Sequence, residues 1–312
     1  MKAAQISEYG DASVIKVTEV ERPTPKDGQV VVEVYASSLN PFDSAVRSGY
    51  VQQNMPLKLP VTIGGDISGV VTEVGAGAEG FSVGDKVYGQ ANVVAGNSGA
   101  FAEYAATAAA QVAKAPSNLS FTEIASLPLV GVSALQALTQ HINLRSGQKI
   151  FINGGAGGIG QVAIQMAKHI GAHIATTATG EEMDAVKALG ADEIIDYKTQ
   201  DFAEILSDYD AVFDTVGGEL FTKTLSTLKQ GGIAVSMAGQ ADEAKVKELG
   251  VTAISQFTHV TTDALNQLRE LIESGVVKPN IGKVFSLEEI QEAFTARETG
   301  SVKGKVVLEI KK

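Results

Sequence analysis

A glycine-rich segment near the middle of the chain carries the clearest chemical signal. Residues 153–160 read Asn-Gly-Gly-Ala-Gly-Gly-Ile-Gly and contain the G-x-G-x-x-G pattern. The first glycine of such a pattern permits a tight turn, the second lets the backbone approach a pyrophosphate, and the third lets helix and strand pack closely. The N–H groups of the following helix attract the phosphates. The residues predicted to contact a dinucleotide are Gly155, Gly157, Gly158, Ile159 and Gly160.

The elements around this segment are those that a phosphate-binding loop requires. Residues 149–153 (KIFIN) predict an apolar strand, and apolar residues from Ile159 to Ile170 recur at steps of three and four, which predicts a helix. Gly171 ends that helix, and residues 173–177 predict the next strand. This strand–helix–strand context favours dinucleotide binding over the alternative, a glycine-rich turn with no ligand.

The end of the next strand indicates which dinucleotide is bound. NAD sites usually carry an Asp or Glu there for the ribose 2′-hydroxyl. This chain reads Ala-Thr-Thr-Ala-Thr-Gly over residues 175–180, without an acid. Thr177 and Thr179 can donate hydrogen bonds to a 2′-phosphate, so the sequence favours NADPH. The alternative is that these threonines only favour a strand.

The pattern of predicted secondary structure divides the chain around the loop into two kinds of region. Residues 148–237 alternate strands and helices, which predicts a doubly wound parallel sheet. The first hundred residues read as short strands between glycine turns, which predicts a compact β-rich unit. Residues 305–310 form a lone strand that can pair with that unit. We therefore expect a discontinuous catalytic domain over 1–118 and 259–312, interrupted by a cofactor domain over 119–258.

Composition excludes several classes of function. Lys and Arg number 25 and Asp and Glu 36 among 312 residues, so the net charge is −11, which disfavours binding to nucleic acid or anionic membrane. The absence of cysteine excludes disulfides, iron–sulfur clusters and Cys-ligated zinc. The four histidines lack metal-ligand spacing, and a serine-hydrolase G-x-S-x-G is absent. Without an apolar signal region or an 18-residue apolar run, we expect a cytoplasmic protein.

Six segments together make the chain resemble the zinc-independent quinone oxidoreductase branch of the medium-chain dehydrogenase/reductases. They are Asn40-Pro-Phe-Asp43, Ile63-Gly-Gly-Asp66-Ile-Ser-Gly69, Gly84-Asp-Lys-Val-Tyr-Gly89, the loop 153–160, Leu189-Gly-Ala-Asp-Glu-Ile-Ile-Asp-Tyr197 and Val212-Phe-Asp-Thr-Val-Gly217. The resemblance covers nearly the whole chain, and the amino-acid sequence of the loop looks closest to that of alkenal and enone oxidoreductases. It implies a Rossmann sheet inserted into a GroES-like β-rich domain, with the active site between them, and a homodimer formed through an edge strand of the cofactor domain.

The resemblance also implies the reaction. Zinc-dependent relatives carry Cys where Asn40 stands and a His-Glu pair where Gly65 and Asp66 stand, and they have a four-cysteine lobe that this chain lacks. No metal is therefore expected. The implied activity is NADPH-dependent hydride transfer to the activated double bond of a small α,β-unsaturated ketone or aldehyde, or to a quinone. Donors near the carbonyl oxygen would stabilise the enolate that develops there.

The family's site residues carry over position by position. Asn40 lies where a polar residue adjoins the nicotinamide, and Arg47 and Tyr50 lie where polar groups line the substrate cleft. Tyr50 can donate a proton or a hydrogen bond to the enolate. A turn for Asn40 and simple packing for Tyr50 are the alternatives, and Asp43 is expected to fix the loop. The positions expected to border the cofactor are Ser133, Tyr197 near the 2′-phosphate, Gly217, Ala238 and Phe257.

Two positions depart from the family pattern. Many NADPH-using relatives have a lysine where Glu182 stands, and a carboxylate there opposes the 2′-phosphate. Enone reductases have a lysine near the nicotinamide where this chain has Ala45. Two alternatives therefore stay open beside enone or quinone reduction: an enoyl-thioester reductase, and an NADPH-binding protein without catalytic activity.

Overall fold

The computed structural model describes residues 1–311 and divides into two compact units. The first unit comprises Met1–Leu129, Val260–Glu273 and the chain from Pro279 onward, and the second comprises Val130–His259 and Ser274–Lys278. The chain leaves the first unit eleven residues later than the expected position 118, and it returns within one residue of position 258. The first unit is thus discontinuous in sequence.

The second unit is a parallel sheet of six strands in the order β11-β10-β9-β12-β13-β14. The chain runs outward from β9 to β11 and then returns to the other side of β9, so the switch point lies between β9 and β12. This order confirms the predicted doubly wound sheet. The strands are β9 (Lys149–Asn153), β10 (His173–Ala178), β11 (Glu193–Asp196), β12 (Tyr209–Asp214), β13 (Leu228–Ser236) and β14 (Thr252–Ser255).

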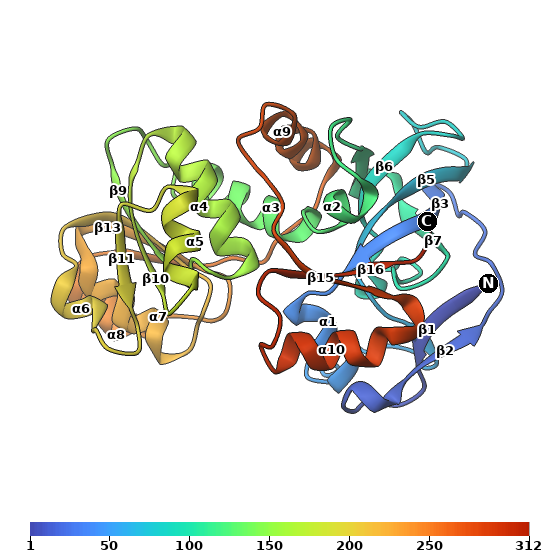
Figure 1. Cartoon of the computed structure of the whole chain (residues 1–312), viewed down its shortest axis with the longest axis horizontal. Helices are drawn as coiled ribbons and strands as arrows, with labels where there is room; N and C mark the ends of the chain where they lie inside the picture. The colour runs from blue at the N-terminus through green and yellow to red at the C-terminus, as the bar shows by residue number, and fades with distance from the viewer. Residues whose placement is uncertain (312) are drawn as a thin grey trace. The chain divides into compact units, whose positions relative to one another are not determined.

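Helices cover this sheet (Figure 1). α4 packs on β9 and β10, and α5 packs on β10 and β11. Side chains of α6 and α7, including Phe202 and Phe221, join Phe151 of β9 and Val212 of β12 in one buried cluster. The helices are α3 (Pro128–Leu135), continued as a π-helix over Gln136–His141, α4 (Gly158–Ile170), α5 (Glu182–Leu189), α6 (Phe202–Ile205), α7 (Glu219–Thr224) and α8 (Glu243–Leu249).

The first unit contains two sheets. A three-stranded sheet has the order β2-β1-β4, and a larger one has the order β15-β16-β3-β5-β6-β8, with β7 also paired to β3. The strands are β1 (Lys2–Ile6), β2 (Ile15–Glu19), β3 (Gln29–Ser38), β4 (Val61–Thr62), β5 (Asp66–Val74), β6 (Lys86–Gln90), β7 (Tyr104–Ala108), β8 (Val112–Lys114), β15 (Ile281–Ser286) and β16 (Lys305–Glu309). The helices are α1 (Pro41–Ser48), α2 (Phe121–Ala125), α9 (Thr262–Glu273) and α10 (Ile290–Glu298).

The C-terminal strand β16 completes the larger sheet. It pairs antiparallel with β3, where Val307 faces Ser38, and parallel with β15 (Figure 1). This pairing confirms the expectation that the lone C-terminal strand joins the N-terminal β unit. Val30, Val32 and Val34 of β3 are fully buried in the core of that unit.

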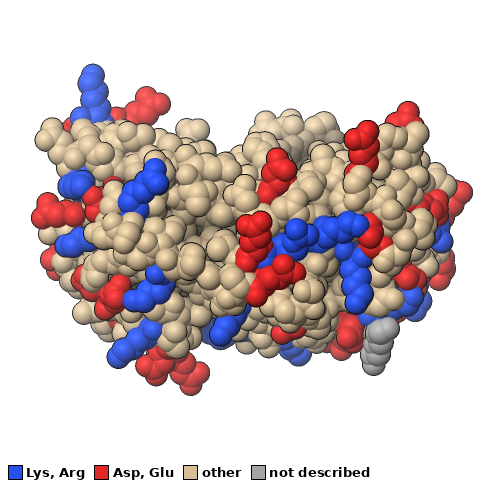
Figure 2. Space-filling view, turned by 90° about the horizontal axis from the view of Figure 1, so that it is seen from above, with Lys and Arg blue, Asp and Glu red and all other residues tan. Residues whose placement is uncertain are grey.

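The surface carries both signs of charge. On the face seen in Figure 2, acidic and basic side chains are interspersed. None of the helices over residues 1–311 combines the length and the apolar character needed to cross a membrane.

Candidate functional site

Two of the three pattern glycines are required by the packing of the chain itself. A Cβ on Gly155 would lie 2.0 Å from Oγ1 of Thr176, and a Cβ on Gly160 would lie 2.3 Å from the carbonyl oxygen of Gly154. Both distances are far below van der Waals contact. Gly155 therefore lets the loop lie directly against β10, and Gly160 lets the start of α4 lie directly against the loop.

Gly157 differs from the other two pattern glycines, Gly155 and Gly160. It is exposed, its φ of −71° suits any residue, and it forms the N-cap of α4 without a side-chain cap. Among the described residues, a Cβ there would approach only the carbonyl oxygen of Gly154, at 3.3 Å. Neither backbone conformation nor internal packing requires glycine at this position. The space that a side chain would fill lies at the N-terminus of α4, the end of a helix that attracts anions, beside Gly158 and Ile159 in the first turn.

A chain of hydrogen bonds joins four strand ends beside this loop. The backbone N–H of Gly154 donates to Oγ1 of Thr177 (2.9 Å), and Thr177 donates to Oδ1 of Asn153 (2.8 Å). Nδ2 of Asn153 donates to Oδ1 of Asp214 (2.8 Å), and Oγ of Ser236 donates to Oδ2 of Asp214 (2.7 Å). The carboxyl ends of β9, β10, β12 and β13 are thereby locked together at the switch point.

This network changes the role expected for Thr177. The side chain is buried, and its single hydroxyl proton is donated to Asn153. Thr177 therefore orients the glycine loop, and the donation to a 2′-phosphate that the sequence suggested would require breaking that bond. Thr179, two residues later, is half-buried at the same edge.

Asp214 also shapes the loop that follows β12. The N–H of Gly217 donates to Oδ2 of Asp214 (2.9 Å). Gly217 has a φ of +82°, and a Cβ there would lie 2.2 Å from the carbonyl oxygen of Ala238, so both the conformation and the close approach require glycine. Two predicted cofactor residues, Gly217 and Ala238, are thus in contact at this edge.

A second set of predicted cofactor residues lies after β14. Oγ of Ser133, which is buried, is 2.7 Å from Oγ1 of Thr258, and Nε2 of Gln256 donates to the carbonyl oxygen of Ser133 (3.0 Å). Phe257 between them is 59% exposed. Oε1 of Gln256 is buried and has no hydrogen-bond partner among residues 1–311. Sequence reasoning missed Gln256 because a glutamine after a strand carries no motif.

An acid lies at the expected adenosine end. The register of β10 and β11 places Asp196 opposite Ala178, and a hydrogen bond from the hydroxyl of Thr179 is the main cause that lowers the pKa of Asp196. Tyr197, the next residue, is 55% exposed. The sequence shows no acid at the end of β10 because the carboxylate comes from the neighbouring strand, β11. Glu182 lies in the first turn of α5, where its charge suits the helix dipole.

In the first unit, Asn40 is the centre of a buried polar cluster. Its backbone N–H donates to Oδ2 of Asp43 (2.7 Å), which fixes the start of α1 as expected for Asp43. Its side-chain Nδ2 donates to Oδ2 of Asp66 (2.8 Å), and its Oδ1 accepts from Nζ of Lys305 (2.6 Å). Asn40, Asp43, Asp66 and Lys305 are each at most 8% exposed.

Burial determines the electrostatics of this cluster. Loss of water raises the pKa of Asp43 to about 7 and raises the pKa of Asp66, although Lys305 opposes both shifts. The same burial lowers the pKa of Lys305 to about 8 in spite of Asp66 and Asp43. Asp66 accepts further bonds from Ser38 (3.2 Å), Gln90 (3.0 Å) and the N–H of Leu129 (3.1 Å). Because these groups are removed from water, each charge is stabilised by the opposite charge and the hydrogen bonds of its neighbours.

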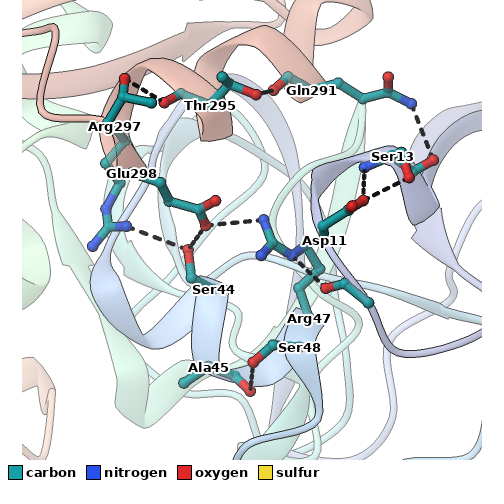
Figure 3. Close-up of polar contacts among 12 residues, drawn as sticks. Asp11, Ser13, Ser44, Ala45, Arg47, Ser48, Gln291, Thr295, Arg297 and Glu298 are labelled. Atoms are coloured by element: carbon teal, nitrogen blue, oxygen red, sulfur yellow. Dashed lines mark hydrogen bonds and ion pairs between the residues drawn. The ribbon is translucent and has the colours of Figure 1, made fainter.

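Arg47 and Tyr50 differ in their surroundings. Arg47 is 5% exposed and donates to Glu298 (2.9 Å; Figure 3). It also donates to the carbonyl oxygen of Gly10 (3.1 Å) and lies over the ring of Phe294. These contacts hold α1 against α10, which is a structural role. Tyr50, just beyond α1, is 86% exposed, so its phenol is accessible. Their part in catalysis stays a prediction.

The sequence predicts that the protein binds no metal, and this prediction concerns the side chains that could act as metal ligands. Within residues 1–311, no group of three or more His, Cys, Asp or Glu side chains is arranged to hold a metal ion. At the position where the family's zinc relatives carry a cysteine, the amide of Asn40 lies between a carboxylate and an ammonium group.

Known proteins place the chain in a family. An "Alcohol dehydrogenase GroES-like domain" model matches residues 26–117, and a "Zinc-binding dehydrogenase" model matches residues 189–308. A 2-methylene-furan-3-one reductase from Solanum lycopersicum is 37% identical over 99% of this chain and 79% of its own length. An NADPH-dependent alkenal/one oxidoreductase from Arabidopsis thaliana is 34% identical over the same shares.

A solved structure agrees with these relatives. The quinone oxidoreductase from Coxiella burnetii superposes with a TM-score of 0.91 at 33% identity, covering 100% of this chain and 99% of the other. Sequence and fold thus agree over the whole length. The chain belongs to the quinone oxidoreductase branch of the medium-chain dehydrogenase/reductase superfamily.

Proposed function

We propose that the protein is an NADPH-dependent reductase of small α,β-unsaturated carbonyl compounds or quinones. The observation that carries this proposal is the space at Gly157, which an ordinary side chain would fill and which nothing in the chain requires to be open. Enone and quinone reductases among the relatives support the substrate class.

Different residues of the chain bind the cofactor, stabilise the developing charge and supply the proton. N–H groups at the start of α4 bind the pyrophosphate, and the network of Asn153, Thr177 and Asp214 keeps the loop in place. A nicotinamide cofactor held there would supply the hydride that the β-carbon of the acceptor receives. Asn40 keeps one side-chain N–H that Asp66 does not use, and this donor stabilises the oxygen on which negative charge develops. The exposed phenol of Tyr50 supplies the proton or a second hydrogen bond.

The reaction is proposed to need no zinc. The Asn40 amide is already bonded on both sides, to Asp66 and Lys305, and a buried ammonium group repels a metal cation at this place. The preference for NADPH is supported by the exposed Tyr197 phenol and opposed by the Asp196 carboxylate. A cytoplasmic location and a homodimer complete the proposal; they are supported by the lack of cysteine and by the edge position of β14.

The test is the loss of absorbance at 340 nm with NADPH or NADH and three acceptors: but-3-en-2-one, 1,4-benzoquinone and crotonyl-coenzyme A. We expect turnover of the enone or the quinone, faster with NADPH at limiting cofactor. Turnover of the thioester alone would replace the proposal with an enoyl-thioester reductase. Tight binding of NADPH without turnover of any acceptor would instead indicate a binding protein without catalytic activity.

A further inference from the structure

Lys305 occupies a position that is unusual for lysine. It is the first residue of β16, it is 8% exposed, and its Nζ donates to the carbonyl oxygen of Leu39 (2.9 Å) and to Oδ1 of Asn40 (2.6 Å). Lysine is almost never buried to this degree unless its charge is paired. Any apolar residue would fill the same place without loss of hydration, so the ammonium group itself has a task.

The partners of Asn40 settle how its amide lies. Lys305 can only donate a hydrogen bond, so the amide oxygen of Asn40 must face Lys305 and its nitrogen must therefore face Asp66. The usual ambiguity between the two ends of an asparagine amide is therefore absent here. One N–H of Asn40 remains for another partner.

Both anchors of the amide are themselves fixed. Asp66 is held by Ser38 and Gln90 from β3 and β6, and Lys305 is held by the carbonyl oxygen of Leu39. Each anchor lies on a strand of the same sheet. A donor held in this way pays little entropy when it binds a ligand, which is what stabilisation of developing charge requires.

We propose that Lys305 is the positioning residue of the active site, because its ammonium group holds the Asn40 amide with the remaining N–H presented to the reacting oxygen. This inference rests on the proposed function, in which Asn40 is the group that meets that oxygen. In this inference Lys305 acts without contacting substrate or cofactor. Its effect on the reaction passes entirely through Asn40.

A purely structural role for Lys305 is the competing explanation. Lys305 also offsets the buried charges of Asp43 on α1 and Asp66 on β5, and Arg297 on α10 adds a second positive charge nearby. Loss of this balance alone would change the stability of the fold. It would not make the effects of Lys305 and Asn40 on turnover depend on each other, and it would not alter the Asn40 amide specifically.

The experiment compares Lys305→Met, Lys305→Arg, Asn40→Ala and the double variant Asn40→Ala/Lys305→Met in the full-length protein. Lys245→Met, at an exposed lysine of α8, is the matched control. We expect Lys305→Met to lower kcat by about 10- to 100-fold, the range for one lost hydrogen bond to a charged group, with the Kd for NADPH unchanged. The double variant is expected to be no slower than Asn40→Ala alone.

Two further measurements separate positioning from structure. The kcat of the wild type should fall above pH 8 as Lys305 loses its proton, whereas Lys305→Arg, which stays charged, should keep its activity there. The ¹⁵N-detected side-chain amide of Asn40, assigned by its loss in Asn40→Ala, should show two separate N–H signals that converge in Lys305→Met. This second readout needs no substrate, and it is also obtained from Lys305→Gln should Lys305→Met not fold.

Each outcome decides the matter. An active wild type with additive Lys305 and Asn40 effects, or an unchanged Asn40 amide in the Lys305 variants, would overturn the inference and leave the proposed function standing. If the wild type reduces no acceptor, the proposed function fails. The amide signals then still show whether Lys305 holds Asn40.

Discussion

The glycine loop of the second unit and the Asn40 cluster of the first unit are built in opposite ways. In the loop, Gly155, Gly157 and Gly160 have no Cβ, so the backbone can approach a strand or a ligand closely. In the cluster, three buried ionisable groups are bonded to one residue: Asp66 and Lys305 to the side-chain amide of Asn40, and Asp43 to its backbone N–H. The comparison shows that a binding surface can be contiguous in sequence, whereas a preorganised donor needs partners from several strands.

The sharpest contrast concerns two of the buried aspartates, Asp66 in the first unit and Asp214 in the second. Asp66→Ala removes the carboxylate that balances Lys305, and we expect a loss of about 3–5 kcal/mol in the free energy of unfolding. Asp214→Ala leaves only neutral donors unsatisfied, from Asn153, Ser236 and Gly217, and should lose about 1–3 kcal/mol. Urea unfolding at pH 7.5 measures both. Equal losses would contradict the view that charge pairing distinguishes the two units.

Within the loop, Gly155 and Gly157 should respond differently. Gly155→Ala forces a Cβ into Thr176 and should destabilise the protein by about 1–3 kcal/mol. Gly157→Val should cost no more than about 1 kcal/mol, because valine is a poorer N-cap residue than glycine, and should weaken NADPH binding by at least about tenfold, because it fills the space proposed for the pyrophosphate. Thermal unfolding and cofactor fluorescence titration give the two quantities. Undiminished NADPH binding by Gly157→Val would remove the observation on which the proposed function depends.

The cluster should also give stability a pH dependence that the loop lacks. Burial raises the pKa of Asp43 to about 7, above its unfolded value, so the folded state binds the proton more tightly. The stability that this proton contributes is fully present below pH 3.8 and is lost as the pH rises through 7. The free energy of unfolding of the wild type should therefore fall relative to Asp43→Asn between pH 5.5 and 7.5. A constant difference between the two proteins would show that Asp43 is ionised throughout.

The smallest effect is expected at the adenosine end. Asp196→Asn removes a negative charge beside Thr179 and should shift the ratio of Kd values for NADH and NADPH toward NADPH by about two- to fivefold, as for exposed charges. The shift should shrink at 0.5 M salt. Glu248→Gln, on the exposed side of α8, is the control and should leave the ratio unchanged. No shift at low salt would mean that Asp196 does not adjoin the 2′-phosphate.

The parts of the molecule that the sequence predicted are those with local causes. The glycine spacing predicted the turn into α4, the alternation of strands and helices predicted the parallel sheet, and both are confirmed by the strand order. The partnership of β16 with β3 was predicted only because a lone strand needs a neighbour. The first two predictions use residues a few positions apart, whereas the third rests on what an unpaired strand requires.

What the sequence did not predict depends on partners far apart in the chain. Lys305 bonds to Asn40 across 265 positions, and Thr177 gives its proton to Asn153 across 24. Asp196 meets Thr179 because two parallel strands share a register. No spacing rule predicts such contacts. The Lys305 cluster was therefore missed, and Thr177 was predicted to bind the 2′-phosphate.

The discontinuity of the first unit has a consequence for synthesis on the ribosome. Every residue of the dinucleotide-binding sheet, through β14, has been made before β16 emerges, so that sheet can form while the chain is still growing. The amide of Asn40, made among the first residues, must wait for Lys305 among the last. A chain cut short before residue 305 would keep the whole phosphate loop and still lack the ammonium group that orients its donor.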